Sequence, residues 1–258
     1  MKRKAEITYF DKLWRKMRRS LEAYLQSGEM EDLHCFRVQV KKIRAFMILA
    51  ESGEKNLDLR QQLKPVKKLF KKAGEIRAVD LHLVMARKQL IKAGLLDEQL
   101  KQRDKALAKF RPLASRRLQR LSHIKKRIYK EIRPIGNVHI SLFYANNLKK
   151  IDKSLGRICF DDRLHNCRKQ LKVLLYNQRL VGPVLNIGFN EDYIDRLQIA
   201  IGDWHDNQVA KQLFKNDRLA LNTINRKDAH LKSRVKQTAK DMYNKATTVN
   251  NLSLPQLS

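Results

Sequence analysis

Residues 33–46, LHCFRVQVKKIRAF, carry the pattern His-x2-Arg-x3-Lys, and residues 164–176, LHNCRKQLKVLLY, carry it again. The pattern falls on His34, Arg37 and Lys41 in the first stretch and on His165, Arg168 and Lys172 in the second. On an α-helix, at about 100° per residue, the three positions lie within roughly 60° of one another. The sequence therefore predicts two helices that each present a stripe of cations, which favours an anionic ligand.

The opposite side of each predicted helix is apolar. Its packing residues are expected to be Phe36, Val40, Ile43 and Met47 in the first stretch and Cys167, Leu171 and Leu174 in the second. Further apolar residues interleave with the basic positions, namely Val38, Ala45, Ile48 and Tyr176. Such interleaving favours the wall of a groove. Either copy alone would also fit the solvated face of an ordinary helix.

Two more segments are rich in cations. Five lysines recur at steps of three and four residues: Lys64, Lys67, Lys68, Lys71 and Lys72. Lysines that are neighbours on one helix repel one another unless an anion screens them. Residues 116–127 contain a third basic block, Arg116, Arg117, Arg120, Lys125, Lys126 and Arg127. For that block a solvated face is at least as good an interpretation as a ligand site.

The composition indicates a folded, strongly basic protein. The chain has 258 residues, of which 43% are hydrophobic, and a formal net charge of +30. Such an excess of cations attracts polyanions, so nucleic acid, an anionic membrane surface and an inorganic polyanion are the candidate partners. The three cysteines, Cys35, Cys159 and Cys167, have neither zinc-site spacing nor the number that a disulfide framework needs.

The sequence predicts a cytoplasmic protein. The N-terminal segment is basic but lacks the continuous apolar core of a signal peptide. No stretch approaches 18 uncharged apolar residues, so we expect no membrane span.

Apolar periodicity predicts an all-α fold. The expected helices cover residues 7–27, 31–50, 57–73, 79–92, 96–110, 113–133, 139–155, 162–180, 191–201, 206–224 and 228–244. Gly74, Gly94 and Pro112 are expected to end helices. Residues 181–190 are expected to form a loop, with a short strand at 184–187 as the alternative. The tail, 249–258, is expected to be disordered.

Two spacings in the chain indicate an internal repeat. The two histidines of the pattern are 131 residues apart, and the pairs Gly74-Glu75 and Gly202-Asp203 are 128 residues apart. A repeat of this length exceeds any solenoid period. We therefore expect one domain over residues 1–248, made of two antiparallel helical bundles at about 1–133 and 134–248.

These segments resemble a known family. The two pattern stretches resemble the signature helices of CHAD domains, the conserved histidine α-helical domain family, in which Lys42 and Arg44 match further basic positions. Residues 73–83, AGEIRAVDLHL, and 201–211, IGDWHDNQVAK, resemble the family's paired Gly-x2-Arg/His-Asp stretches. Val173 and Leu175 stand where the family often has basic residues, and Ala78 replaces the usual aspartate after Arg77.

The resemblance implies a pseudo-twofold pair of bundles around a basic central groove or pore. It implies binding of inorganic polyphosphate and association with polyphosphate granules. The expected phosphate-binding residues are His34, Arg37, Lys41, Lys42, Arg44, Lys67, Lys71, Arg77, His165, Arg168, Lys172 and His205. We expect no catalytic residues, no metal and no cofactor.

Two other functions compete with this interpretation. Charge alone is compatible with non-specific nucleic-acid binding, but only 7% of the residues are aromatic and no nucleic-acid-binding motif is present. A metal-dependent phosphohydrolase using His205 and Asp206 is the second alternative. Arg77 occupies the position of His205 in the other repeat, which fits a cation better than a metal ligand.

Overall fold

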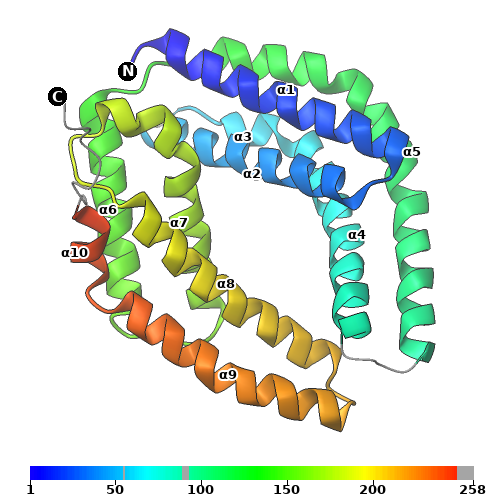
Figure 1. The fold of residues 1–258 in the computed structure, drawn as a ribbon. Helices are drawn as coiled ribbons and strands as arrows, with labels where there is room; N and C mark the ends of the chain where they lie inside the picture. The colour runs from blue at the N-terminus through cyan, green and yellow to red at the C-terminus, as the bar shows by residue number, and fades with distance from the viewer. Residues whose placement is uncertain (55, 89–92, 249–258) are drawn as a thin grey trace, which may run out of the picture. The chain divides into compact units, whose positions relative to one another are not determined.

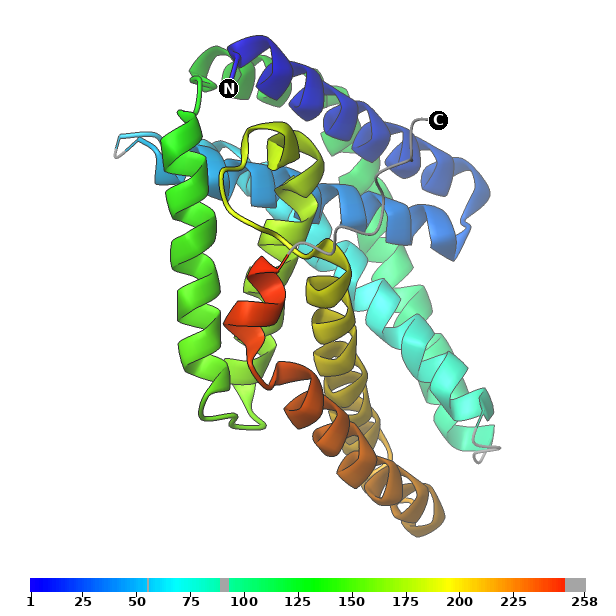
Figure 2. The same ribbon diagram turned by 60° about the vertical axis from the view of Figure 1, so that its left-hand side comes forward.

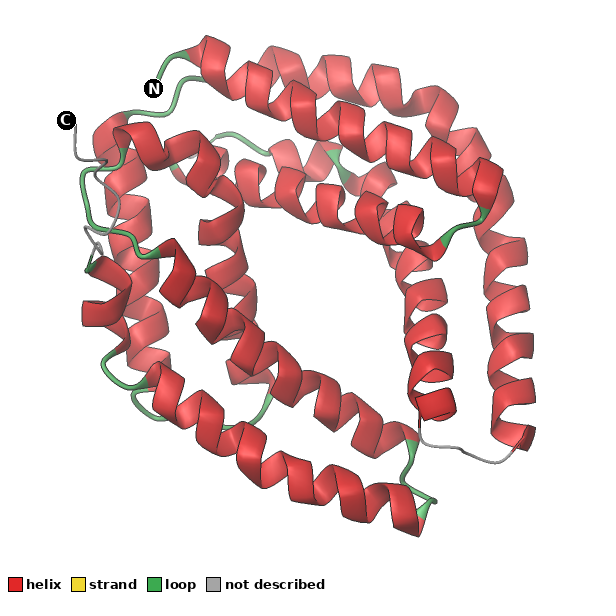
Figure 3. Cartoon of the chain, in the orientation of Figure 1, coloured by secondary structure: helices red, strands yellow, loops and turns green. Residues whose placement is uncertain are grey.

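The computed structural model describes residues 1–54, 56–88 and 93–248, and this part of the chain is helical without any strand (Figure 3). The expected all-α class is confirmed. Residues 182–184 form a single 3₁₀ turn, η1, and residues 185–190 follow as a loop, so the short strand is not formed. The expected disordered tail, 249–258, lies outside the described residues. No described helix is both long enough and apolar enough to cross a membrane.

The chain divides into two compact units, Met1–Ile135 and Gly136–Ser258. Unit 1 contains α1 (Arg3–Ser27), α2 (Met30–Ser52), α3 (Leu59–Gln62), α4 (Lys64–Lys88) and α5 (Ala93–Glu131). Unit 2 contains α6 (Asn137–Leu155), α7 (Asp162–Val181), α8 (Glu191–Leu213), α9 (Arg218–Ala239) and α10 (Met242–Thr247).

In unit 1, α1 packs on α2 and α5, and α4 packs on α2 and α5. Gly28 allows the sharp turn between α1 and α2, because its φ of 74° lies in the left-handed region that favours glycine. The core is aromatic on both sides of α1. Phe10 packs against Phe46 of α2, and Tyr24 meets Phe110 of α5 edge to face, with ring centroids 5.7 Å apart.

In unit 2, α7 packs on α6 and α8, α9 packs on α8, and α10 closes against α6 and α8. Figures 1 and 2 show α8 and α9 side by side along most of their length. The buried hydroxyl of Tyr144 on α6 donates to the backbone carbonyl of Leu174 on α7 at 2.7 Å. A polar group within the core is thus satisfied, and it ties these two helices together.

Several expected helix ends are wrong. Gly74 lies inside α4 and Gly202 inside α8, so neither glycine terminates its helix. Pro112 lies inside α5, which replaces the two expected helices at 96–110 and 113–133. The real breaks fall elsewhere in unit 2: α9 begins after Asp217, whose side chain accepts the N–H of Ala220, and α10 begins after Asp241.

Pro112 makes α5 less stable than it could be. A proline inside a helix removes one backbone hydrogen bond and costs about 3 kcal/mol relative to alanine. Pro112 is exposed, so an alanine there meets no packing constraint and can donate its N–H to the carbonyl of Ala108. Pro112→Ala should raise the free energy of unfolding by about 1–3 kcal/mol, measured by urea denaturation.

The matched control is Pro134→Ala, which changes an exposed proline outside any helix and should leave stability nearly unchanged. A loss of stability in Pro112→Ala would contradict a continuous α5.

Candidate functional site

The first group of predicted site residues lies on α2 and α4 of unit 1. We call His34, Arg37, Lys41, Lys67, Lys71 and Arg77 the first cationic face. The expected packing residues Phe36, Val40, Ile43 and Met47 are fully buried. Burial of that side leaves the cations of α2 half-buried, whereas Lys67 and Lys71 of α4 are exposed. Lys42 and Arg44 are half-buried on α2, on either side of this stripe.

Arg37 joins the two helices of this face. Its Nη1 donates to the backbone carbonyl of Phe70 on α4 at 2.7 Å, and its guanidinium lies 4.3 Å from the centre of the Phe70 ring. A Cβ atom on Gly74 would lie only 2.5 Å from that Nη1. Gly74 is therefore present for close approach of the arginine, which explains why a glycine lies in the middle of α4.

The second group lies on α7 and α8 of unit 2 and repeats this contact. We call His165, Arg168, Lys172 and His205 the second cationic face. Nε of Arg168 donates to the backbone carbonyl of Gln198 at 3.1 Å. A Cβ on Gly202 would lie 2.5 Å from Nη2 of Arg168. In both units the accepting carbonyl belongs to the residue four positions before the glycine. The two arginines therefore bind at corresponding places on α4 and α8.

Two basic groups of the first face, His34 and Arg37, have lowered pKa values. The pKa of His34 is lowered first by burial and then by the nearby charge of Arg77. The pKa of Arg37 is lowered by the same two causes. Two carboxylates offset part of this charge, because Glu31 acts in the opposite direction on His34 and Nη1 of Arg77 donates to Asp80 at 2.9 Å. The face holds more positive charge than its own carboxylates neutralise.

The second face shows the same crowding. Burial, followed by the nearby His205, lowers the pKa of His165 to about 4. The two imidazole rings are stacked with centroids 4.1 Å apart, and Nδ1 of His165 is buried without a hydrogen-bond partner among the described residues. The pKa of Lys172 is lowered by burial and by Arg168, while Asp195 and Asp206 act in the opposite direction.

The two faces differ in charge, and the difference lies largely on α4 and α8. Lys67 stands seven residues before Gly74, whereas Asp195 stands seven residues before Gly202. Lys71 and Ile199 likewise both stand three residues before the glycine. Residues 1–135 contain 36 Lys and Arg against 15 Asp and Glu, and residues 136–258 contain 20 against 11. Unit 1 therefore carries most of the excess positive charge.

Sequence reasoning missed the residues that contact the two arginines. Phe70, Gly74, Gln198 and Gly202 were not predicted site residues, and the recurring Gly-acidic pair was interpreted only as a repeat with helix ends. The signal was available, because the pair follows each pattern stretch at a similar distance. Asp195 was missed because its correspondence to Lys67 appears only when α8 is aligned with α4.

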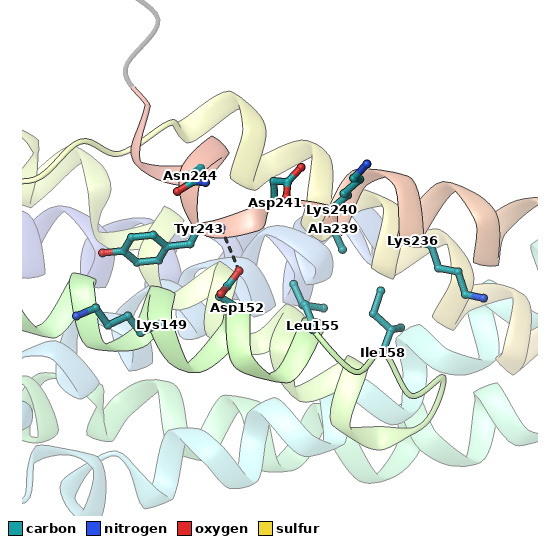
Figure 4. Close-up of a pocket in the computed structure, with 11 residues that line it drawn as sticks. Lys149, Asp152, Leu155, Ile158, Lys236, Ala239, Lys240, Asp241, Tyr243 and Asn244 are labelled. Carbon is teal, nitrogen blue, oxygen red and sulfur yellow. Dashed lines mark hydrogen bonds between the residues drawn. The ribbon is translucent and has the colours of Figure 1, made fainter.

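One cavity lies within unit 2, apart from the second cationic face. It has a volume of about 720 Å³ and lies among α6, α9 and α10, and none of the predicted site residues lines it (Figure 4). The side chains of Lys149, Lys236 and Lys240 point away from one another there, and Asp152 accepts the backbone N–H of Tyr243 at 3.1 Å. We interpret this cavity as a gap at the interface where α10 packs against α6.

The second face also contains the residues of the phosphohydrolase alternative. Nδ1 of His205 lies 3.7 Å from Asp206, whose side chain is 63% exposed. Within residues 1–54, 56–88 and 93–248, no three His, Cys, Asp or Glu side chains are grouped to hold a metal ion.

The contact between Arg37 and Gly74 predicts an energetic coupling between the two residues. Gly74→Ala improves helix propensity by about 1 kcal/mol, but its Cβ displaces Arg37 and removes a hydrogen bond of similar value. In an Arg37→Ala background only the gain in helix propensity remains. A double-mutant cycle by urea denaturation should therefore give a coupling free energy of about 1–2 kcal/mol.

The same cycle with Gly202 and Arg168 should give a coupling at least as large, because three guanidinium atoms of Arg168 lie 2.5–2.8 Å from that Cβ position, against 2.5–3.4 Å for Arg37 at Gly74. Gly136→Ala is the control, since nothing lies within 4 Å of its Cβ position. If Gly74→Ala changed the free energy of unfolding equally with and without Arg37, the two residues would not be coupled.

The comparisons with known proteins identify the family and a similar fold. The family model named CHAD domain matches residues 8–215. The crystal structure of the CHAD domain from the plant Ricinus communis has a similar fold, with a TM-score of 0.64 over 96% of this chain and 92% of that one, at 16% sequence identity. No curated protein matches the chain significantly. Because the family model covers most of its residues, the chain belongs to the CHAD family.

Proposed function

We propose that the protein binds inorganic polyphosphate without catalysis, through the cationic faces of both units. The observation that carries this proposal is the crowding of half-buried basic side chains whose pKa values are lowered by burial and by one another. Crowded cations destabilise a fold until an anion joins them. A bound phosphate chain would relieve this repulsion in each unit.

Polyphosphate suits the residue types of these faces. The polymer carries about one negative charge per phosphate and has no bases, so its recognition depends on charge-assisted hydrogen bonds. A guanidinium has five N–H donors. Arg37 and Arg168 direct one of theirs to a backbone carbonyl and retain others for phosphate oxygens. Polyphosphate is also the ligand that the CHAD resemblance implies.

The faces would contribute unequally. Lys67 and Lys71 add exposed cations to the first face, whereas Asp195 and Ile199 occupy the corresponding positions of the second. The first face should therefore hold phosphate more strongly. An internal duplication, a groove shared by both units and association with polyphosphate granules stay predictions.

Stabilisation by ligands tests the proposal directly. A ligand that binds the native state raises the melting temperature with its concentration. Long-chain polyphosphate should raise the melting temperature more than duplex DNA or single-stranded RNA at equal phosphate concentration and physiological salt. Incubation with Mg²⁺ should release no phosphate. Stabilisation by DNA equal to that by polyphosphate would contradict the preference, and phosphate release that depends on His205 would favour an enzyme.

Charge variants of α4 provide matched controls. Lys67→Gln with Lys71→Gln should weaken polyphosphate binding and reduce its salt dependence, because each removes a phosphate contact. Lys68→Gln removes one lysine charge from another side of α4 and should have little effect. Lys172→Gln should weaken binding less, and no effect at all would restrict binding to the first face.

His165 makes both stability and binding depend on pH. Its folded pKa of about 4 lies below the ordinary 6.5, so only the unfolded state takes up a proton as the pH falls between these values. The free energy of unfolding should therefore decrease over that window. A bound phosphate raises the pKa of His165, so binding takes up protons and should strengthen as the pH falls. His165→Gln should flatten both dependences, measured by urea denaturation and titration calorimetry.

A further inference from the structure

A cationic groove lies between α1 and α5 of unit 1, on helices that contribute nothing to the first cationic face. It encloses about 600 Å³, and its lining includes Trp14, Arg15 and Arg18 from α1 with Lys126, Tyr129 and Lys130 from α5. The helices run antiparallel here, because Asp11 pairs with Lys125 while Tyr24 packs on Phe110. Each lining set occupies one side of its helix, so two stripes face each other across the groove.

The groove contains aromatic surface between its cations. Trp14 is only 2% exposed and packs against Phe10, with ring centroids 5.4 Å apart, so it forms a fixed wall. Tyr129 is 37% exposed. It lies next to Lys130 and one helical turn after Lys126. A planar group could therefore stack on the Tyr129 ring while cations contact its anionic substituents.

Two of the cations that line the groove are engaged in ion pairs, and three others are exposed. Lys125 is engaged by Asp11 at 2.9 Å, and Arg18 by Glu22 at 2.8 Å. Arg15, Lys126 and Lys130 are exposed. The sequence favoured a solvated face for the basic block at residues 116–127 at least as much as a ligand site. In the structure Lys125 and Lys126 of this block line a groove with an aromatic wall.

We propose that this groove binds single-stranded nucleic acid, with one base stacked on Tyr129 and the adjacent phosphates on Arg15, Lys126 and Lys130. Base stacking on aromatic side chains tolerates any sequence, and flanking cations follow the backbone. Polyphosphate has no ring to place on Tyr129. Duplex DNA keeps its bases paired inside the helix, so it cannot stack a base on Tyr129 either.

Fluorescence anisotropy of a labelled oligothymidylate with the full chain tests the assignment. Tyr129→Leu keeps an apolar side chain but removes the ring, and it should weaken binding about 5- to 100-fold. Lys126→Gln with Lys130→Gln should weaken binding and reduce its salt dependence. Unchanged affinity in Tyr129→Leu, or duplex DNA of the same length binding as tightly, would overturn the proposal.

Two controls separate this groove from the polyphosphate faces. Tyr243→Leu removes a half-buried tyrosine in unit 2 and should leave oligothymidylate binding unchanged. Lys67→Gln with Lys71→Gln should also leave it unchanged. In the reverse direction, Tyr129→Leu should retain full stabilisation by polyphosphate. Loss of oligothymidylate binding in the Lys67 and Lys71 variant would assign the nucleic acid to the first cationic face and contradict the groove.

Discussion

The close approach of an arginine to a helix backbone is the constraint on which both cationic faces depend. Arg37 and Arg168 each reach across to the neighbouring helix and donate to a carbonyl beside a glycine. Any side chain at Gly74 or Gly202 would occupy the volume of the guanidinium. The contact sets which sides of α2 and α4, and of α7 and α8, meet, and so it positions the remaining cations.

This constraint also shows why part of the fold could be predicted and part could not. The buried sides of α2 and α7 follow directly from apolar residues at helical spacing, and Phe36, Val40 and Leu171 lie where the period places them. Gly74 was interpreted wrongly because a glycine that ends a helix and one that admits a side chain look alike locally. Only Arg37, 37 residues earlier, distinguishes them.

Pro112 and the tertiary contacts of the site illustrate the same limit of local patterns. The packing of α5 against α1 and α4 holds a continuous helix through a residue that disfavours it. The twelve predicted phosphate-binding residues divide between two units, and each group occupies a single helix pair. The stacking of His165 on His205 required knowledge of how α7 meets α8, which no spacing within one helix provides.

The unequal charge of the two units has a kinetic consequence. Long-range attraction depends on net charge and speeds the encounter, whereas short-range hydrogen bonds mainly determine how slowly a complex dissociates. Unit 1, with a net charge of +21 against +9 for unit 2, should attract an approaching polyanion more strongly. Its lysines would then govern the association rate, while the anchored arginines of both units would govern the residence time.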